Sequence, residues 1–504
     1  MTILKPGKNC SGIYQADTTG LIIDACDYYR LFFHTASKAR RYILMTGWQF
    51  DTEVSLLRGQ DAGAADGDIK FIHFLEELCT HNAGLEIYIL AWDFSLFFAM
   101  EREWFQDVIF DWSTNERINF RFDSNHAFNA THHQKLVIID GEIAFVGGMD
   151  ICSSRWDDRY HLLDNPDRKD SDGNPYGSYH DIQSYHTGPI VKEMVDIFLD
   201  RWQYSGAEPL SLPAPEEHLP LIDCGPLFPL AANLVAISRT QAKILQPPLN
   251  EILEIRHLFV DAIMAAEKLI YLENQYFSSQ CIYWTLIDRM TAADRSRIQI
   301  VMILPDRLPF TEELLIGLPQ MKMFRSLQQV ADENGHNMGI FSSVYIKGDE
   351  RKLTFIHSKL LMVDDRFLTI GSANITNRSL GLDTELNVSW EAESGEQTEL
   401  ISSIRAIRAS LLAEHAGMFG QDREHKFEQV DDLVYYLGHL ADDPETRLCR
   451  YSPEPSLENS SWQDALAPIT RIVDPEEDLF EKLSKDTGKA FAKSIRTLNQ
   501  IIGI

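Results

Sequence analysis

The feature that most constrains this chain is a short pattern that occurs twice. It consists of a His, a Lys two residues later, an Asp five residues after that and a Gly seven residues further on. The first copy is formed by His133, Lys135, Asp140 and Gly147, and the second, 224 residues later, by His357, Lys359, Asp364 and Gly371. A single His-x-Lys pair is common, but two copies with the same downstream spacing in an alternating strand–turn–strand context indicate a duplicated unit.

The segments around the two copies also repeat. Residues 30–50 and 257–277 both have a helical pattern followed by an apolar strand, and residues 84–93 match residues 297–306 as a second apolar strand. A repeat of this length indicates duplication of a whole domain rather than a short-period solenoid. Because mostly apolar strands alternate with helices, we expect an α/β fold of two pseudo-twofold-related α/β/α sandwich domains with mostly parallel sheets.

Changes of composition suggest where these domains begin and end. Six prolines punctuate residues 206–230, which we interpret as a connection between the domains. The first domain is then expected over residues 1–205 and the second over residues 231–420. Residues 421–504 form an acidic C-terminal extension that ends in an amphipathic helix.

Two segments leave a choice between packing and membrane contact. Residues 96–105 are helical in pattern and rich in aromatic side chains, so they either pack in the core or form an apolar lip that meets lipid. Residues 474–477, Asp-Pro-Glu-Glu, have the features of a helix start. The basic amphipathic helix expected after them either docks on the protein or lies on an anionic bilayer.

The composition narrows the class of protein. The formal charge is −29, from 46 Lys and Arg against 75 Asp and Glu, which is a poor surface for a nucleic-acid duplex. The seven cysteines show neither a CxxC pair nor a Cys/His metal spacing, so free thiols in a reducing compartment are expected. The N-terminus lacks a signal-peptide core, and no apolar run approaches the length of a membrane span. We therefore expect a cytoplasmic protein that is soluble or peripherally membrane-associated.

The two motifs suggest one shared pocket. A His and a Lys two residues apart on a strand point to the same face, so two such strands related by a pseudo-twofold axis bring together two His and two Lys. Lysine ammonium groups suit phosphate oxygens, and Asn374 adds amide donors. Such a cluster neutralises a phosphodiester without an ion. No run of carboxylates or of His and Cys offers a metal site, so no cofactor is expected, and calcium would serve membrane docking rather than chemistry.

Two histidines that face each other across a phosphorus atom permit in-line displacement through a phosphohistidine. One imidazole attacks while the other protonates the leaving alkoxide and then activates the acceptor. Each ring needs a partner on its other nitrogen, and the candidates are the carboxylates of Asp181 and Glu385, for which ordinary ion pairing is the alternative. The remaining motif residues are expected to shape turns and close approaches, with the two aspartates bonded to backbone amides: Asp140, Asp364, Gly147, Gly148, Gly371 and Ser372.

The duplicated pattern resembles the hallmark of the phospholipase D superfamily, His-x-Lys-x4-Asp-x6-Gly. The resemblance extends to residues 132–157, 179–202, 273–277 and 356–388, and it covers roughly residues 10–416. These segments look like the eukaryotic-type branch and its bacterial relatives. The resemblance implies that His133 is the nucleophile and His357 the general acid, and that Lys135, Lys359 and Asn374 bind the phosphate.

The resemblance also implies that Asp181 and Glu385 orient the histidines, and we expect Glu385 to keep the imidazole of His357 protonated. One position departs from the symmetric pattern, because Asp150 stands where the second copy has Asn374. A carboxylate there would repel phosphate, so Asp150 is expected to turn away or to contact a neighbouring amide. His132 lies beside the nucleophile but on the opposite face of its strand, where a structural role is expected.

The family implies a function as well. A phospholipase D hydrolyses the headgroup phosphodiester of a glycerophospholipid at a membrane surface, giving phosphatidic acid, with water or an alcohol as acceptor. The alternatives are phosphatidyl transfer of the cardiolipin synthase type, hydrolysis of another phosphodiester such as nucleic acid, and a non-catalytic lipid-binding scaffold. The acidic charge argues against a nucleic-acid partner, and the intact His and Lys residues argue against a scaffold. With both motifs in one chain, a monomer suffices for catalysis.

Overall fold

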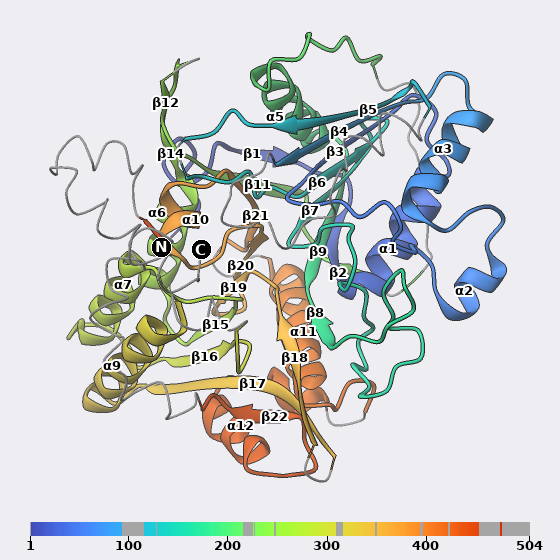
Figure 1. Ribbon diagram of the computed structural model, residues 1–504. Helices are drawn as coiled ribbons and strands as arrows, with labels where there is room; N and C mark the ends of the chain where they lie inside the picture. Colours follow the sequence, from blue (N-terminus) through green and yellow to red (C-terminus); the bar gives the residue numbers. More distant parts are fainter. Residues whose placement is uncertain are drawn as a thin grey trace, which may run out of the picture.

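The computed structural model describes residues 2–92, 115–127, 129–214, 225, 227–245, 248–308, 316–347, 350–393, 397–421, 424–452 and 474–475. In these residues two large β-sheets lie at the centre and helices pack around them (Figure 1). The residues expected to form an apolar lip, 96–105, lie outside the described residues. So do the helix expected beyond residue 477 and most of the second half of the proline-rich connection.

The first sheet has eight strands in the order β10-β2-β9-β7-β6-β3-β4-β5. In chain order they are β2 (Thr19–Ile23), β3 (Tyr42–Gly47), β4 (Glu86–Trp92), β5 (Ile118–Asp123), β6 (Leu136–Ile139), β7 (Ile143–Gly147), β9 (Ile182–Thr187) and β10 (Phe228–Pro229). The helices of this half are α1 (Asp24–Ala36), α2 (Gly59–Ala64), α3 (Phe71–His81) and α5 (Ile190–Tyr204). Strand β3 is buried along its whole length, because helices cover both faces of the sheet.

The second sheet has twelve strands, of which ten follow the order β1-β11-β21-β20-β19-β15-β16-β17-β18-β8. They are β1 (Gly12–Gln15), β8 (Ser178–His180), β11 (Leu234–Gln241), β15 (Leu269–Glu273), β16 (Gln299–Ile303), β17 (Asn337–Lys347), β18 (Glu350–Ile356), β19 (Leu360–Val363), β20 (Phe367–Gly371) and β21 (Glu385–Glu391), with β14 (Ile252–Leu253) on β11 and β22 (Leu448–Arg450) on β17. The helices are α6 (Glu254–Ala265), α7 (Gln280–Thr291), α9 (Leu318–Asn334), α10 (Asn377–Gly381), α11 (Thr398–His415), η3 (Glu424–Glu428) and α12 (Leu433–Ala441). A separate ribbon pairs β12 (Ile244–Leu245) with β13 (Pro248–Leu249).

The duplication predicted from the sequence is present in the strand order. The run β9-β7-β6-β3-β4-β5 of the first sheet corresponds, strand by strand, to the run β21-β20-β19-β15-β16-β17 of the second. In each half the motif forms the central hairpin, β6–β7 in the first and β19–β20 in the second. The α/β class and the pair of related domains are therefore confirmed.

The expectation of mostly parallel sheets is wrong. In the described residues, parallel pairing joins β3 to β4 and β4 to β5 in the first sheet, and β15 to β16, β16 to β17 and β18 to β8 in the second. All other strand pairs described are antiparallel. The reason is local, since each motif folds as a tight hairpin, which forces antiparallel pairing.

The two halves exchange strands rather than remaining separate. Strands β1 and β8 come from the first half of the chain but pair in the second sheet, whereas β10, from the proline-rich connection, pairs with β2 of the first. One buried core contains residues of β6 and β7 together with residues of β19 and β20 and of helices α5 and α11. The motif hairpins of the two halves are thus packed against a common core.

Two further observations concern cysteines and membranes. Cys10, Cys26, Cys79, Cys152 and Cys281 form no disulfide, as expected of free thiols. None of the helices in the described ranges is both long enough and apolar enough to cross a bilayer.

Candidate active site

Each motif is held in place by backbone of the opposite half. The amide of His133 donates to the carbonyl of Thr384 over 2.9 Å, and the amide of Thr384 donates back to Thr131 over 2.8 Å. In the second half, β18 pairs in parallel with β8, and the amide of His357 donates to the carbonyl of His180 over 2.8 Å. Thr384 directly precedes Glu385, and His180 directly precedes Asp181. These backbone bonds therefore place the carboxylate of each half beside the histidine of the other.

The histidine–carboxylate pairs are therefore crossed. Nδ1 of His133 lies 3.0 Å from Oε2 of Glu385 and 2.9 Å from the carbonyl oxygen of Ser372. Nδ1 of His357 lies 2.6 Å from Oδ2 of Asp181. Both carboxylates were predicted as partners, but the expectation that Glu385 acts on His357 is wrong. The cause is the strand exchange between the halves, which the sequence does not display.

These contacts define which ring nitrogen is available. A carbonyl oxygen only accepts hydrogen bonds, so the contact with Ser372 requires Nδ1 of His133 to carry its hydrogen. Nε2 of the neutral ring then carries the lone pair. At His357, Oδ1 of Asp181 accepts the amide hydrogen of Ile182, which leaves Oδ2 to accept the hydrogen of Nδ1. In both rings the nitrogen distal to the carboxylate is the one left for chemistry.

The two motif lysines lie in the same pocket and are almost completely buried, each with 2% of its surface exposed. Nζ of Lys135 donates to the carbonyl of His133 over 3.0 Å, and Nζ of Lys359 donates to the carbonyl of His357. Burial and the neighbouring charge of Lys135 lower the pKa of Lys359 to about 7, despite the opposing effect of Asp181. The pocket thus concentrates positive charge in a site shielded from water.

The same environment acts on the imidazoles. Burial and the charges of Lys135 and Lys359 lower the pKa of His133 well below its usual value. Burial, Lys359, Arg155 and Lys135 do the same to His357. The expectation that a carboxylate keeps His357 protonated is not met in the free pocket, because burial and the surrounding cations outweigh the partner carboxylate.

Both partner carboxylates are shifted in the opposite direction. Burial and the nearby charge of Asp383 raise the pKa of Glu385 to about 8, and burial raises the pKa of Asp181. Ser372 donates its hydroxyl to Oε2 of Glu385 and accepts the amide of Leu386 over 3.0 Å. The serine of the second motif therefore fixes the orientation of the acid that contacts His133.

The position that breaks the symmetry of the motifs behaves as expected. Oδ1 of Asp150 accepts the amide hydrogen of Trp48 over 2.9 Å, and Oδ2 lies 3.1 Å from Nζ of Lys135. The carboxylate is thus neutralised by an amide and a lysine. Its counterpart, Asn374, is buried and its Oδ1 accepts no hydrogen bond, so its predicted contact with phosphate remains a prediction.

The two motif aspartates fix the ends of strands. The carboxylate of Asp140 accepts the backbone amides of residues 40, 41 and 42 at 2.8 to 3.0 Å. The carboxylate of Asp364 accepts those of residues 267, 268 and 269 at 2.7 to 2.8 Å. Both residues adopt a left-handed backbone, with φ of 54° and 55°. The prediction that they shape turns by binding backbone amides is confirmed.

The motif glycines permit a close approach of the strand that carries the acid. A β-carbon on Gly148 would lie 2.2 Å from Oδ1 of Asp181, and one on Gly371 would lie 2.2 Å from the carbonyl oxygen of Leu386. A side chain at Gly147 would meet Oε1 of Gln183 at 2.3 Å. These positions need glycine because the neighbouring strand leaves no space for a β-carbon.

His132 contacts different partners from its neighbour. Its Nε2 lies 3.2 Å from Oδ2 of Asp123, which also accepts from Arg201 of α5. Burial and Arg201 lower the pKa of His132 to about 4, although Asp123 acts in the other direction. These contacts agree with the structural role expected for this residue.

Sequence reasoning missed one cation of the pocket. The guanidinium of Arg155 lies 5.0 Å from the ring centre of Tyr179, whose ring lies 5.4 Å from that of His357. Its charge is one of the causes of the low pKa of His357. Arg155 follows the first motif in a stretch without periodic pattern, so nothing in its local sequence marked it.

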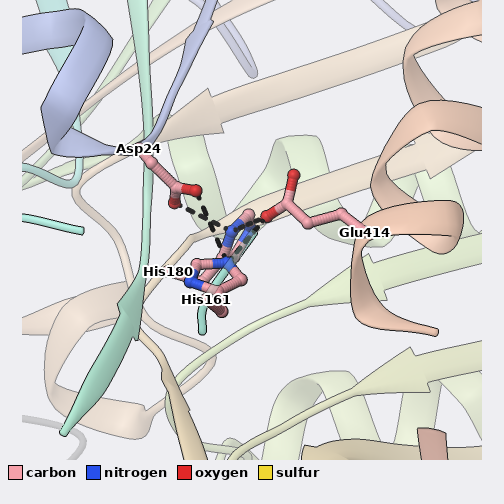
Figure 2. A group of neighbouring side chains, drawn as sticks. All are labelled: Asp24, His161, His180 and Glu414. Carbon is pink, nitrogen blue, oxygen red and sulfur yellow. Dashed lines mark hydrogen bonds and ion pairs between the residues drawn. The ribbon is translucent and has the colours of Figure 1, made fainter. Parts of the chain in front are cut away.

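Sequence reasoning also missed a cluster of titratable groups next to the pocket. Asp24, His161, His180 and Glu414 each offer a potential metal-ligand atom, and these atoms lie within 4.8 Å of one another (Figure 2). All four side chains are fully buried. They come from distant parts of the chain, so no local spacing could have revealed them.

Two family models match parts of this chain. Residues 35–219 match a family model described as phospholipase D, and residues 259–407 match one described as cardiolipin synthase, PLD-like domain. Phospholipase D alpha 1 of Ricinus communis is 23% identical over 81% of this chain and 66% of that protein. Phospholipase D alpha 1 of Zea mays is 22% identical over 77% of this chain and 63% of that protein. The chain thus spans slightly less than two thirds of the length of these plant relatives.

Among solved structures, the phosphatidylserine synthase of Haemophilus influenzae Rd KW20 has a similar fold. The TM-score is 0.52 at 14% sequence identity, and the alignment covers 96% of both chains. At this identity the likeness concerns the fold alone.

Proposed function

This chain is a member of the phospholipase D superfamily, and from that premise we propose that it cleaves the headgroup phosphodiester of glycerophospholipids to give phosphatidic acid. The observation that carries the proposal is the crossed pairing of His133 with Glu385 and of His357 with Asp181. It gives one pocket two oriented imidazoles with their distal nitrogens available, beside two buried lysines.

In the proposed reaction the substrate phosphate lies between Lys135 and Lys359, whose ammonium groups neutralise it. Nε2 of His133 attacks the phosphorus, and the bond to the headgroup oxygen breaks on the opposite side. The proton that this oxygen needs comes from Nε2 of His357. The products of this half-reaction are the free headgroup alcohol and a phosphatidyl group bound to His133.

In the second half-reaction Nε2 of His357 takes the proton of an incoming water or alcohol. The acceptor oxygen attacks phosphorus, the bond to His133 breaks, and phosphatidic acid or a new phosphatidyl ester leaves. His357 ends protonated and ready for the next cycle. No step requires a metal ion, because the lysines supply the positive charge.

The low pKa of His357 in the free pocket fits this cycle. Burial and the positive charges of Lys359, Arg155 and Lys135 disfavour a further positive charge on the ring. A bound diester carries a negative charge and offsets the lysines, so the pKa of His357 rises when substrate binds. The pocket thus makes protonation of the general acid dependent on the bound phosphodiester, whose leaving oxygen it must protonate.

Phosphatidyl transfer is the second candidate, because residues 259–407 match the model described as cardiolipin synthase, PLD-like domain. The covalent intermediate is the same in both reactions, and they differ in the acceptor that enters the pocket. Cleavage of nucleic acid is less favoured, because the chain carries a formal charge of −29 and a phosphate polymer requires a basic face.

The test is product analysis by mass spectrometry. The protein is incubated with vesicles of mixed glycerophospholipids, with and without ethanol or glycerol, beside a His133→Ala variant as control. We expect phosphatidic acid without alcohol and phosphatidyl alcohol with it, and neither product from the variant. Phosphatidyl esters without any phosphatidic acid would favour a dedicated transferase, and no lipid turnover at all would contradict the proposal.

The metal-free chemistry has its own test. Lipid turnover measured immediately after addition of excess EDTA should be unchanged, because no step at phosphorus uses an ion. A complete loss that is restored by a divalent ion, measured on a short-chain substrate in solution so that membrane docking plays no part, would contradict it.

A further inference from the structure

The buried cluster of Asp24, His161, His180 and Glu414 lies behind the His357 half of the pocket. Its members come from the N-terminus of α1, the loop before β8, the last residue of β8 and the end of α11. Figure 2 shows the two carboxylates on opposite sides of the two imidazoles, with all four groups directed at a common centre. His180 directly precedes Asp181, the partner of His357.

The distances around this centre are short. Nε2 of His161 lies 3.1 Å from Oε1 of Glu414 and 3.4 Å from Oδ2 of Asp24. Nδ1 of His180 lies 3.1 Å from Oδ1 of Asp24 and 2.6 Å from Oε1 of Glu414. Four ligands about 2.0–2.1 Å from a tetrahedral ion lie roughly 3.3 Å from one another. Both contacts of His161 are close to that value, whereas the contact between His180 and Glu414 would have to open by about 0.7 Å. The contact between His180 and Asp24 uses the other carboxylate oxygen, Oδ1.

Hydrogen bonds leave two of these atoms unsatisfied. The contact between His161 and Glu414 has hydrogen-bond geometry. Neither contact of Nδ1 of His180 does, and neither that atom nor Oδ2 of Asp24 forms a hydrogen bond. Both atoms are fully buried. A hydrogen on Nδ1 of His180 would therefore point at neither carboxylate, whereas its lone pair and that of the Asp24 oxygen both suit an ion between them.

The outer nitrogens of the two imidazoles are held as metal-binding histidines usually are. Nδ1 of His161 lies 2.9 Å from Oδ2 of Asp157, and Nε2 of His180 lies 3.0 Å from Oε2 of Glu273. A carboxylate on the far nitrogen fixes the tautomer, so that the near nitrogen presents its lone pair to the metal. The second oxygen of Glu414 is fixed by the guanidinium of Arg159.

Two positive charges would balance the carboxylates at this place, although burial and Glu414 also raise the pKa of Asp24 to about 6. Arg168 neutralises Asp157 and Arg159 neutralises Glu414. Among the described residues, the ion pairs of Asp24 and Glu273 are with imidazoles alone. Two buried carboxylates thus need either two imidazolium ions or one divalent cation.

Protons are the competing explanation. Although burial lowers the pKa values of both imidazoles, the neighbouring carboxylates outweigh it. The pKa of His161 is raised to about 9 and that of His180 well above its usual value. Two protons, however, would make neighbouring cations of two rings whose centres lie 5.9 Å apart, and they would leave the hydrogen of His180 without an aligned acceptor. A divalent ion supplies the same charge at one point and keeps both rings neutral.

We propose that Asp24, His161, His180 and Glu414 form a buried binding site for one divalent transition metal, with Zn²⁺ as the best match to two imidazoles and two carboxylates. The ion ties α1, the loop before β8, β8 and α11 together. It touches neither the substrate nor the reacting imidazoles, so its role is structural and separate from the proposed phosphodiesterase chemistry. Because its ligands are buried, brief treatment with EDTA leaves it in place.

The first experiment is elemental analysis of the full chain, produced with Zn²⁺ in the medium and dialysed extensively. We expect about one zinc ion per chain, as for other closed four-ligand sites. Protein produced with Co²⁺ in place of Zn²⁺ should show the visible absorption of four-coordinate cobalt. A folded chain with less than about a tenth of an ion, and without the cobalt spectrum, would show that protons close the cluster and would overturn the proposal.

The second experiment locates the ion. Asp24 has a left-handed backbone, with φ of 63°, and asparagine tolerates that conformation well. Asp24→Asn therefore removes the charge with little change of shape, and we expect the zinc content to fall at least about fivefold together with the melting temperature. Circular dichroism checks that the variant is folded, and Glu414→Gln serves as a second ligand variant.

The matched control is His186→Gln, which changes another fully buried histidine. Nδ1 of His186 lies 3.0 Å from the hydroxyl of Thr19 and its Nε2 2.8 Å from that of Ser184, so it has no part in the cluster. Its zinc content should equal that of the unmodified chain. Zinc retained by folded Asp24→Asn and Glu414→Gln variants would place the ion elsewhere and would contradict the assignment.

Discussion

The two halves of this molecule share a motif and a strand order, yet they treat their histidines differently. The ring of His133 is held by a glutamate and a backbone carbonyl, Glu385 and Ser372 of the other half. The ring of His357 is held by an aspartate, Asp181, which has a shorter side chain and lies 2.6 Å from Nδ1 of the ring. A duplicated sequence therefore produces a pocket that is symmetric in its composition and asymmetric in its contacts.

The asymmetry extends to the charges. Asp150 lies against Lys135, whereas the second half has Asn374 at the corresponding position and leaves Lys359 without such a contact in the described residues. Arg155 adds a further cation on the side of His357. These differences suit a division of labour in which the first half supplies the nucleophile and the second supplies the acid. The following predictions test that division, from the largest expected effect to the smallest.

The largest difference is expected between the two histidines themselves. Both His133→Ala and His357→Ala should lower lipid turnover at least about 10⁴-fold, because each removes a group that the reaction needs. The roles of the two histidines can be distinguished with a short-chain phosphatidyl ester of 4-nitrophenol. The 4-nitrophenolate anion leaves without protonation, so this substrate needs no general acid. With this substrate His357→Ala should still form the phosphoenzyme, and His133→Ala should not.

Rapid quenching followed by mass spectrometry of the protein detects the covalent intermediate. A phosphoenzyme in His133→Ala, but none in His357→Ala, would reverse the two roles. Retention of near-normal turnover by either variant would remove that histidine from the mechanism.

A smaller effect is expected from the crossed carboxylates. Glu385→Gln and Asp181→Asn keep the shape of the side chain but weaken its hold on the tautomer of the ring, so each should lower turnover by roughly 10²–10³-fold. Because Glu385 contacts His133, its variant should slow phosphoenzyme formation with any leaving group. Because Asp181 contacts His357, its variant should recover with the nitrophenyl ester.

The crossed assignment of the two carboxylates is wrong if the nitrophenyl ester restores turnover in Glu385→Gln and not in Asp181→Asn. That outcome would mean that each acid serves the histidine of its own half, contrary to the contacts described.

The third prediction concerns pH. The pKa of Lys359 is lowered to about 7 by burial and by Lys135, so the charged form is present below that pH and is lost as the pH rises through it. A soluble phosphodiester keeps its single negative charge throughout this range. As a competitive inhibitor of the free protein it should therefore bind up to about tenfold more weakly at about pH 8.5 than at about pH 6.

Lys359→Arg is the control, because a guanidinium remains charged in this range. Its inhibition constant should depend less on pH than that of the unmodified chain, and the dependence that remains should reflect Glu385, whose pKa is raised to about 8 by burial and Asp383. An equal pH dependence in the variant would assign the effect to another group.

The smallest effect is expected at Asp150. Its carboxylate partly neutralises Lys135, so Asp150→Asn should strengthen binding of the same soluble diester by a few-fold, about 0.5–1 kcal/mol. The amide oxygen can still accept the hydrogen bond from Trp48. Weaker binding in this variant would mean that Asp150 orients Lys135 rather than opposing its charge.

Much of this protein could be predicted from the sequence because the relevant signals are local. The duplicated spacing predicts that His133 and Lys135 share one face of an extended segment, and the same holds for His357 and Lys359. In the structure these segments directly precede β6 and β19. The expected role of Asp140 in a turn also came from local spacing, since Asp140 begins the turn between β6 and β7. The amides that it accepts, of residues 40–42, come from a distant part of the chain. Secondary structure and chemistry of this kind depend on a few neighbouring residues.

The remaining features depend on contacts between distant parts of the chain. Glu385 meets His133 across 252 positions, and Asp181 meets His357 across 176. The pairing of Asp181 with His357 follows from β8 entering the second sheet. The pairing of Glu385 with His133 follows from the backbone bonds of Thr131 and His133 with Thr384. No local periodicity encodes these pairings. The mostly antiparallel pairing and the Asp24 cluster have the same origin.

The sequence by itself therefore determined the duplication, the chemical groups of the pocket and the class of reaction that they suit. The tertiary structure decided which acid orients which histidine, and how burial and neighbouring charge shift the pKa values of these groups. It also brought Asp24, His161, His180 and Glu414 together. The physical reason is that side-chain spacing along a strand is a property of the local backbone. Pairing between strands and burial are properties of the whole packed molecule.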